Sequence, residues 1–291
     1  MPKILSLKIL FLLLISFSIQ GQTKVFVDEN MQEIDSISFY KKCDARVFKC
    51  LTYNTDSLIV NKVHNRFKFG KVSTEEYNQV RLLLMKKGNF IIDKKEILVI
   101  EKIDTIGGSY SSYLNHMRKY HKKDSNKNTD STNSSSNGIK VYLNNKQVKP
   151  TPKIKSKKSY NRSYKAHMKI PAKCKKKFEK KFSTSVFTMY KHNTHENELP
   201  KTLDLINHSE IIENTFFNQI DSAHFVILKP DGEYFISSVL FKDSYLLGFF
   251  KNDNWEKHKK DLELSKNQNI KSGSGIFKPF VAVGQIPLRC F

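Results

Sequence analysis

The sequence predicts a mixed α/β fold, and three observations carry this prediction. Ile97–Ile100 is an unbroken apolar run, which is typical of a strand that is covered on both faces. Ile212, Phe216 and Ile220 recur at helical spacing, so they indicate a helix with one buried face. The sequence Pro-Asp-Gly at 230–232 separates two short apolar runs, and these residues favour a hairpin turn.

The N-terminal residues have the pattern of a secretory signal peptide. Lys3 and Lys8 precede an apolar and serine-containing run, Ile9–Ile19, which is followed by the small residue Gly21. A charged start, a short apolar run and a small residue at the cut define such a leader, and the run is about half the 20 residues that a membrane-spanning helix needs. We therefore expect a signal peptide at 1–21, no transmembrane segment in the mature chain, and a secreted or periplasmic protein.

Residues 22–90 are expected to form a small α+β unit. Ser73 and Glu76 have the spacing of a capping box, in which each side chain bonds the other residue's backbone N–H at a helix start. Alternating apolar residues indicate the strands, and turn residues at 54–57 separate the second strand from the third. The predicted elements are a strand at 24–27, a helix capped by Ser36, strands at 47–53 and 58–69, and a helix from Ser73 to Gly88.

Residues 91–291 are expected to form a larger α/β domain. Pro171 is predicted to begin a helix, because a proline in the first helical turn loses no hydrogen bond. Cys174, Phe178 and Phe182 follow at four-residue spacing and should face the core. The other predicted elements are strands at 97–100, 186–190, 225–228 and 234–237, and helices at 110–120, after Ser209, at 246–250 and at 255–264.

A basic segment interrupts this domain and carries most of the net charge of the chain. The formal charge is +22, and residues 118–182 hold 21 Lys and Arg against three acidic residues. Within this stretch, residues 122–162 lack hydrophobic periodicity and contain Ser/Asn and Pro/Lys tracts. Such composition buries too little apolar surface to offset chain entropy, so we expect a disordered insertion there, with one short strand at 139–143.

This basic segment has two interpretations. It is either a solvated surface that keeps the chain soluble, or a binding surface for polyanions such as anionic envelope glycans, lipids or nucleic acid. In the second interpretation Tyr160 and Tyr164 are candidates for stacking on bases. The candidate polyanion-binding residues are Lys153, Lys155, Lys157, Lys158, Arg162, Lys173, Lys175, Lys176 and Lys177.

Four cysteines favour disulfide bonds in a secreted chain. Cys43 and Cys50 are close enough in sequence to form a local bridge, and Cys174 and Cys290 would then tie the C-terminus to a core helix. The alternative is four reduced, buried thiols. The nearest approach to a metal site, His192, His195 and Glu196, falls in a Lys/Asn loop, so we expect no metal and no cofactor.

The element order of residues 95–255, leaving out the basic insertion, resembles the βαβαββα core of the thioredoxin-like fold found in secreted envelope proteins. The apolar strand, Pro-Asp-Gly turn, second strand and following helix at 225–250 carry most of this resemblance. It implies a thioredoxin-like α/β domain. The redox motif of that family is absent, because 106–109 reads Ile-Gly-Gly-Ser where a C-x-x-C pair would stand, and Ser222-Ala223 replaces the usual proline.

The sequence thus contains no complete catalytic motif, and we expect no catalytic residues. The favoured hypothesis is a non-catalytic scaffold or binding protein of the bacterial cell envelope. The alternative is a divergent thioredoxin-like thiol-disulfide oxidoreductase whose cysteines act in another arrangement.

Overall fold

The computed structural model describes residues 23–89, 91–105, 109–125, 141–143, 146–148, 153–192, 205–239, 247–250, 254–267 and 274–277. These residues confirm a mixed α/β chain. They belong to two compact units, one with the residues up to Ser73 and from Glu210 onward, the other with Thr74–Ser209. The predicted signal peptide at 1–21 lies outside the described residues.

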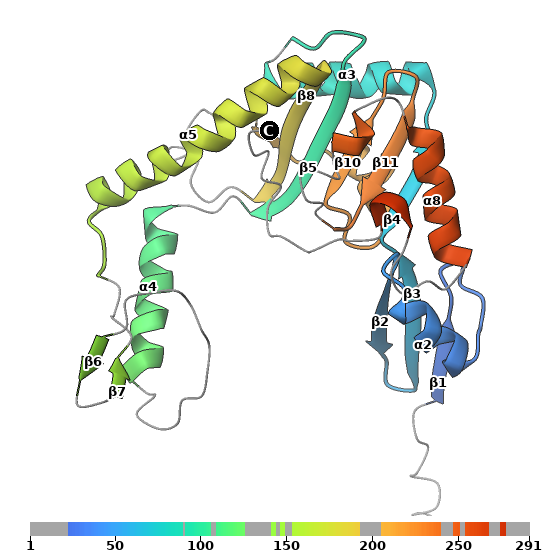
Figure 1. Ribbon diagram of the computed structural model, residues 1–291, viewed down its shortest axis with the longest axis horizontal. Coiled ribbons are helices and arrows are strands. Elements are labelled where there is room, and N and C mark those ends of the chain that lie inside the picture. Colours follow the sequence, from blue (N-terminus) through green and yellow to red (C-terminus); the bar gives the residue numbers. More distant parts are fainter. Residues whose placement is uncertain are drawn as a thin grey trace, which may run out of the picture. The chain divides into compact units, whose positions relative to one another are not determined.

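The first unit contains a three-stranded sheet, three strands of a second sheet and several short helices (Figure 1). Strand β3 pairs in parallel with β1 and antiparallel with β2, and β11 pairs antiparallel with both β10 and β4. Its elements are β1 (Thr23–Val27), α2 (Ser36–Asp44), β2 (Phe48–Asn54), β3 (Leu58–Asn65), β4 (Phe67–Lys71), α6 (Glu210–Thr215), η2 (Phe217–Gln219), β10 (Phe225–Leu228), β11 (Glu233–Ser237), η3 (Leu247–Phe249), α8 (Trp255–Asn267) and η4 (Gly275–Phe277).

The alternating segment 58–69 forms two strands rather than the single strand that its pattern predicts. β3 ends at Asn65, and β4 joins β11 with Phe69 opposite Phe235. The Phe235 ring lies 4.8 Å from that of Phe69 and 4.3 Å from that of Phe249. This aromatic contact and the pairing with β11 join β4 to the C-terminal strands, and the compact unit that contains them runs to Ser73 and resumes at Glu210.

The predicted hairpin between β10 and β11 is confirmed. Gly232 donates its N–H to Lys229 O at 3.0 Å, and Lys229 donates to Glu233 O at 2.8 Å. Gly232 has a φ of +84° and a Cβ there would lie 1.9 Å from Val72 O. The turn therefore requires glycine both for its left-handed backbone and for the close approach of the chain after β4.

The second unit contains three strands that pair in parallel, together with three helices and a short hairpin. β5 pairs in parallel with β8, with Ile97 opposite Thr184, and β8 pairs in parallel with β9. The predicted buried strand is confirmed, since Leu98, Val99 and Ile100 are at most 2 % exposed. Its elements are α3 (Thr74–Gly88), β5 (Ile97–Thr105), α4 (Tyr110–Ser125), β6 (Val141–Leu143), β7 (Lys146–Val148), α5 (Lys157–Phe182), β8 (Thr184–His192) and β9 (Leu205–Asn207).

The structure corrects the predicted disorder of residues 122–162 at both ends. Helix α4 continues to Ser125, and α5 already begins at Lys157. β6 and β7 form an antiparallel pair between them, which includes most of the strand expected at 139–143. Composition alone overlooked these elements, because lysines on the exposed side of a helix lower the mean hydropathy without interrupting its buried side.

The sequence predicts that Pro171 begins a helix, but in the structure Pro171 lies inside α5. A proline within a helix removes one hydrogen bond and costs about 3 kcal/mol. Buried Cys174 and Phe178 lie one and two turns after Pro171, and tyrosines in contact with α4 precede it. We attribute the continuity of α5 to these packed residues on both sides of the proline.

Candidate functional site

Helix α5 brings together more of the predicted polyanion-binding residues than any other described element. The side chain of Ser156 accepts the backbone N–H of Ser159 and caps the first turn. The last turn ends at Ser183, whose left-handed backbone (φ 49°) lets its N–H bond to Glu179 O. The helix has 26 residues, so it is about 39 Å long.

The C-terminal half of α5 is fixed to the second unit by an apolar face. Cys174 and Phe178 are each 1 % exposed, and Phe187 on β8 is 2 % exposed. The ring of Phe182, one turn further on, lies 5.1 Å from that of Phe178. α5 lies alongside β8 here and continues beyond the strand toward its own N-terminus (Figure 1). The predicted core-facing orientation of Cys174 and Phe178 is thus confirmed.

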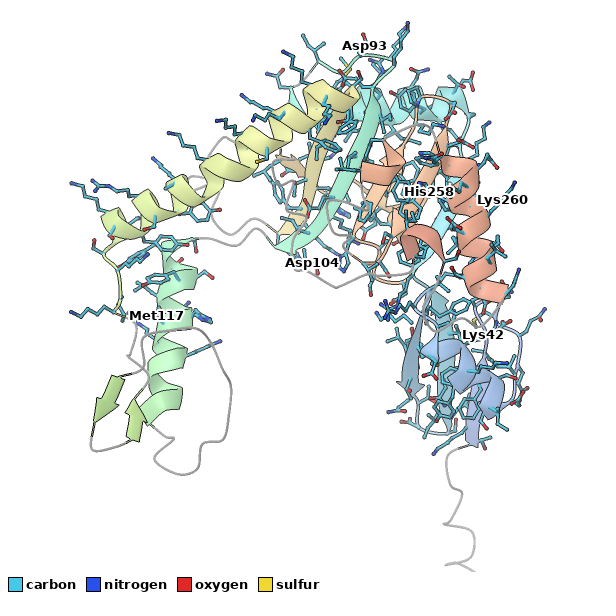
Figure 2. All side chains as sticks on the ribbon, in the orientation of Figure 1. Lys42, Asp93, Asp104, Met117, His258 and Lys260 are labelled. Carbon is cyan, nitrogen blue, oxygen red and sulfur yellow. A yellow bond between two sulfur atoms is a disulfide. The ribbon has the colours of Figure 1, made fainter. Side chains whose placement is uncertain are left out.

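The opposite side of α5 is strongly basic. The helix contains eleven Lys and Arg residues and one acidic residue, Glu179, so its net charge is +10. Side chains tipped with nitrogen project from α5 away from β8 (Figure 2). The predicted residues with exposed side chains are Lys153, Lys155, Lys157, Lys158, Arg162, Lys173, Lys176 and Lys177.

Lys175 differs from these residues because it is buried. It is 6 % exposed, and its Nζ lies 2.5 Å from Glu179 Oε1. The same carboxylate oxygen accepts the backbone N–H of Val186 at 3.0 Å. Lys175 therefore stabilises the junction between α5 and β8. Unlike the exposed lysines, it is not accessible to an anion in solvent.

The N-terminal half of α5 is held by four tyrosines rather than by the sheet. The Tyr113 ring stacks on that of Tyr160 at 4.8 Å, and Tyr160 stacks on Tyr164 at 6.1 Å. Tyr110 lies 5.7 Å from Tyr160. Burial raises the pKa of Tyr164, and the neighbouring Tyr160 adds to this effect. These contacts were not predicted; the four-residue spacing of Tyr160 and Tyr164 was their signal.

Two tyrosine hydroxyls also bind the backbone just before α5. Tyr110 Oη donates to Lys155 O at 2.9 Å, and Tyr113 Oη accepts the N–H of Lys155 at 2.9 Å. Both backbone groups of one residue are thereby satisfied by α4. This pair of bonds, with the stacked rings, forms what we call the tyrosine latch (Tyr110, Tyr113, Tyr160 and Tyr164), and it fixes where α5 begins.

A second polar cluster lies in the first unit, and the sequence did not predict it. Lys49 Nζ lies 2.8 Å from Asp221 Oδ2 and 3.1 Å from Ser222 Oγ, and Ser222 has a φ of 54°. Burial raises the pKa of Asp221, but the hydrogen bonds from Lys49 and Ser222 lower it by more, so it is ionised at neutral pH. The cluster is an ion pair that joins β2 to the residues before β10.

The cysteines are arranged for structure rather than for exchange. Cys43 at the end of α2 and Cys50 on β2 form the predicted disulfide, with a Cα–Cα distance of 5.6 Å. No free thiol occurs among the described cysteines. Cys290, the predicted partner of Cys174, lies outside the described residues, so this pairing stays a prediction.

The described residues hold neither a cluster of metal ligands nor a membrane-spanning helix. No three His, Cys, Asp or Glu side chains in the described ranges come together as ligands for a metal ion; His195 and Glu196 lie outside those ranges. Among the described helices, none combines the length and apolar character needed to cross a bilayer. Comparison of the chain with family models, curated proteins and solved structures finds no match.

Proposed function

We propose that this chain is a non-catalytic binding protein of the extracytoplasmic space, which binds polyanions through the exposed basic face of α5. The observation that carries the proposal is the net charge of +10 on a single helix whose position is fixed by buried Cys174 and Phe178. A fixed array of like charges creates a local positive potential that attracts anionic polymers and releases their counterions on binding.

Two features support the extracytoplasmic location and the scaffold role. The Cys43–Cys50 disulfide is compatible with an oxidising compartment. The leader pattern at 1–21 supports export. Intact-mass analysis of the exported protein tests this part of the proposal: a chain that starts at Gln22 supports it, and retention of Met1 contradicts it.

We also propose that residues 95–255 have a thioredoxin-like core without thioredoxin chemistry. The parallel pair β5 and β8, joined through α4 and α5, and the antiparallel hairpin of β10 and β11 support this proposal. The oxidoreductase alternative requires an accessible thiol, whereas Cys174 is buried and Cys43 is bonded to Cys50. Catalysis of insulin reduction by the purified chain would establish the alternative.

Binding to an immobilised sulfated polysaccharide tests the main proposal. A variant with Lys173, Lys176 and Lys177 replaced by glutamine removes three charges from α5. Its control replaces Lys86, Lys94 and Lys95, which are equally exposed but lie outside α5. We expect the wild type and the control to elute at similar salt and the α5 variant to elute earlier, because each charge removed reduces the counterions released.

Two outcomes of that experiment overturn the proposal. If the wild type fails to bind at low salt, α5 is only a solubilising surface. If the two variants elute together, the net charge of the protein rather than α5 determines retention.

A further inference from the structure

We infer that α5 binds a linear anionic polysaccharide along one row of cationic side chains. This inference rests on the proposed function and specifies the ligand class and the part of α5 that contacts it. The row takes one basic residue from almost every turn, and all its members have exposed side chains. They are Lys158, Arg162, Lys165, Lys169, Lys173, Lys176 and Lys180.

The spacing keeps these seven residues on one side of the helix. Successive members are four, three, four, four, three and four residues apart, and residues at these intervals lie on the same helical face. Each step is one turn, so the charges recur about every 5.4 Å along the axis. A sugar unit in an extended chain has a similar length. An extended polymer with one anionic group per unit can therefore pair with successive turns of α5.

The row is free to bind because the structure uses the other side of α5. Tyr160, Tyr164, Cys174 and Phe178 lie opposite the row, where they contact α4 or the core of the second unit. Within the described part of the chain, the seven members of the row form no ion pair with another side chain. Lys175, which has such a pair, lies off the row.

The chemistry of the row favours a polysaccharide over a single-stranded nucleic acid. Proteins that bind single strands combine cationic side chains with aromatic rings that stack on bases. The predicted stacking residues Tyr160 and Tyr164 face away from the row and stack within the tyrosine latch. Six of the seven members are lysines, and lysine contributes charge without the bidentate geometry that arginine offers to phosphate.

The row also differs from a helix that lies in a membrane surface. Such a helix inserts an apolar face into the headgroup region beside its basic face. The apolar face of α5 packs in the second unit, with Cys174 and Phe178 each 1 % exposed. Anionic lipid can therefore attract α5 by charge only, without the added stabilisation of apolar insertion.

A pair of charge-matched variants of the mature full-length chain tests the inference. The row variant replaces Lys165, Lys169 and Lys173 by glutamine. The off-row variant replaces Lys157, Lys177 and Lys181, which are exposed on other sides of α5. Glutamine has nearly the helix propensity of lysine, and circular dichroism checks that helix content is unchanged. Fluorescence anisotropy measures binding of a labelled linear polyuronate with one carboxylate per sugar.

We expect the row variant to lose about tenfold or more in affinity at low salt, which corresponds to about 1.4 kcal/mol, and the off-row variant to lose clearly less. Equal losses in the two variants would overturn the single row while leaving polyanion binding by α5 intact. Tighter binding of oligothymidylate of equal charge, or of phosphatidylglycerol vesicles, would overturn the ligand class. Failure of the wild type to bind any of these probes would instead reject the proposed function itself.

Discussion

Lys175 Nζ lies 2.5 Å from Glu179 Oε1, one turn further along α5, and this carboxylate also accepts the N–H of Val186. The pair therefore joins the last turns of the helix to the strand that follows it. Its neighbour Lys176 has the same charge but an exposed side chain. Two adjacent lysines thus have separable roles, one in the fold and one in the proposed binding row.

Replacing these two lysines singly should separate stability from binding. We expect Lys175→Met to lower the free energy of unfolding by about 1–3 kcal/mol, because it leaves the Glu179 carboxylate without its charged partner. Lys176→Met should change stability by less than about 0.5 kcal/mol but weaken retention on an anionic polysaccharide. Urea unfolding and salt elution measure the two effects. If Lys175→Met loses more retention on the polysaccharide than Lys176→Met does, this division of roles is wrong.

The Cys43–Cys50 disulfide should stabilise the protein modestly. The bridge spans a sequence separation of 7, and the loop-closure entropy of so short a ring corresponds to about 2.5 kcal/mol. We expect the double variant Cys43→Ala/Cys50→Ala to unfold at lower urea concentration by this amount. Because the bridge is far in sequence from α5, polyanion binding should persist under native conditions.

A non-reducing peptide map of the wild type tests whether Cys174 is joined to Cys290. Recovery of a Cys50–Cys174 peptide would contradict both pairings.

Glu233 on β11 should make stability depend on pH. Its two carboxylate oxygens lie 2.9 Å from Lys229 Nζ and 2.6 Å from Lys259 Nζ. Burial raises the pKa of Glu233, but the hydrogen bonds and charges of Lys259 and Lys229 lower it by more, so the pKa lies below the ordinary value of 4.5. A carboxyl group with a lowered pKa stabilises the fold above its unfolded-state pKa, and this contribution is lost as pH falls through the folded-state pKa.

We therefore expect Glu233→Gln to be less stable than the wild type by about 1–2 kcal/mol at neutral pH, and the difference to shrink toward zero below about pH 4. Glu256→Gln is the control, because Glu256 also contacts Lys259 but its side chain is 77 % exposed, where an ion pair contributes less than about 1 kcal/mol. Urea unfolding at several pH values measures both. A difference that grows as the pH falls would contradict the assigned sign.

The sequence predicts the elements whose signals are local and strong. The structure confirms three such predictions: the strand at Ile97–Ile100, the hairpin at the Pro-Asp-Gly turn and the Cys43–Cys50 disulfide. The sequence does not reveal that β3 and β4 belong to different sheets, because the same alternation continues through both strands. β3 pairs with β1 and β2, whereas β4 pairs with β11.

The basic face of α5 was located only in part for a similar reason. Mean composition treats exposed and buried positions alike, so the lysines concealed the helical spacing of Tyr160 and Tyr164, whereas the spacing of Cys174 and Phe178 was recognised. Pro171 then suggested a helix start that contacts on both sides override. Lys175 is buried beside Glu179, with which it forms an ion pair. Nothing in the sequence of the basic run distinguishes Lys175 from the exposed lysines next to it.

The tyrosine latch determines which part of the basic insertion can be removed. Deleting 122–162 takes away Lys155, the cap Ser156 and Tyr160, whose ring stacks on Tyr113. We expect that deletion to shorten α5 and lower stability. Replacing 126–150 alone leaves α4, the latch and all of α5 in place, and it removes β6 and β7, which pair with each other.

In the variant that replaces 126–150, the linker must span the distance from the C-terminal end of α4 to the tyrosine latch, which lies at the N-terminal end of α4. α4 has 16 residues and is about 24 Å long, so ten Gly/Ser residues, which reach about 33 Å, suffice. We expect this variant to keep the thermal stability of the wild type and its binding to polyuronate, because the proposed row begins at Lys158. Differential scanning calorimetry and anisotropy measure the two properties. Loss of binding with unchanged stability would show that the binding surface lies in the insertion rather than on α5. Equal stability of the two deletion variants would show that the tyrosine latch does not contribute to stability.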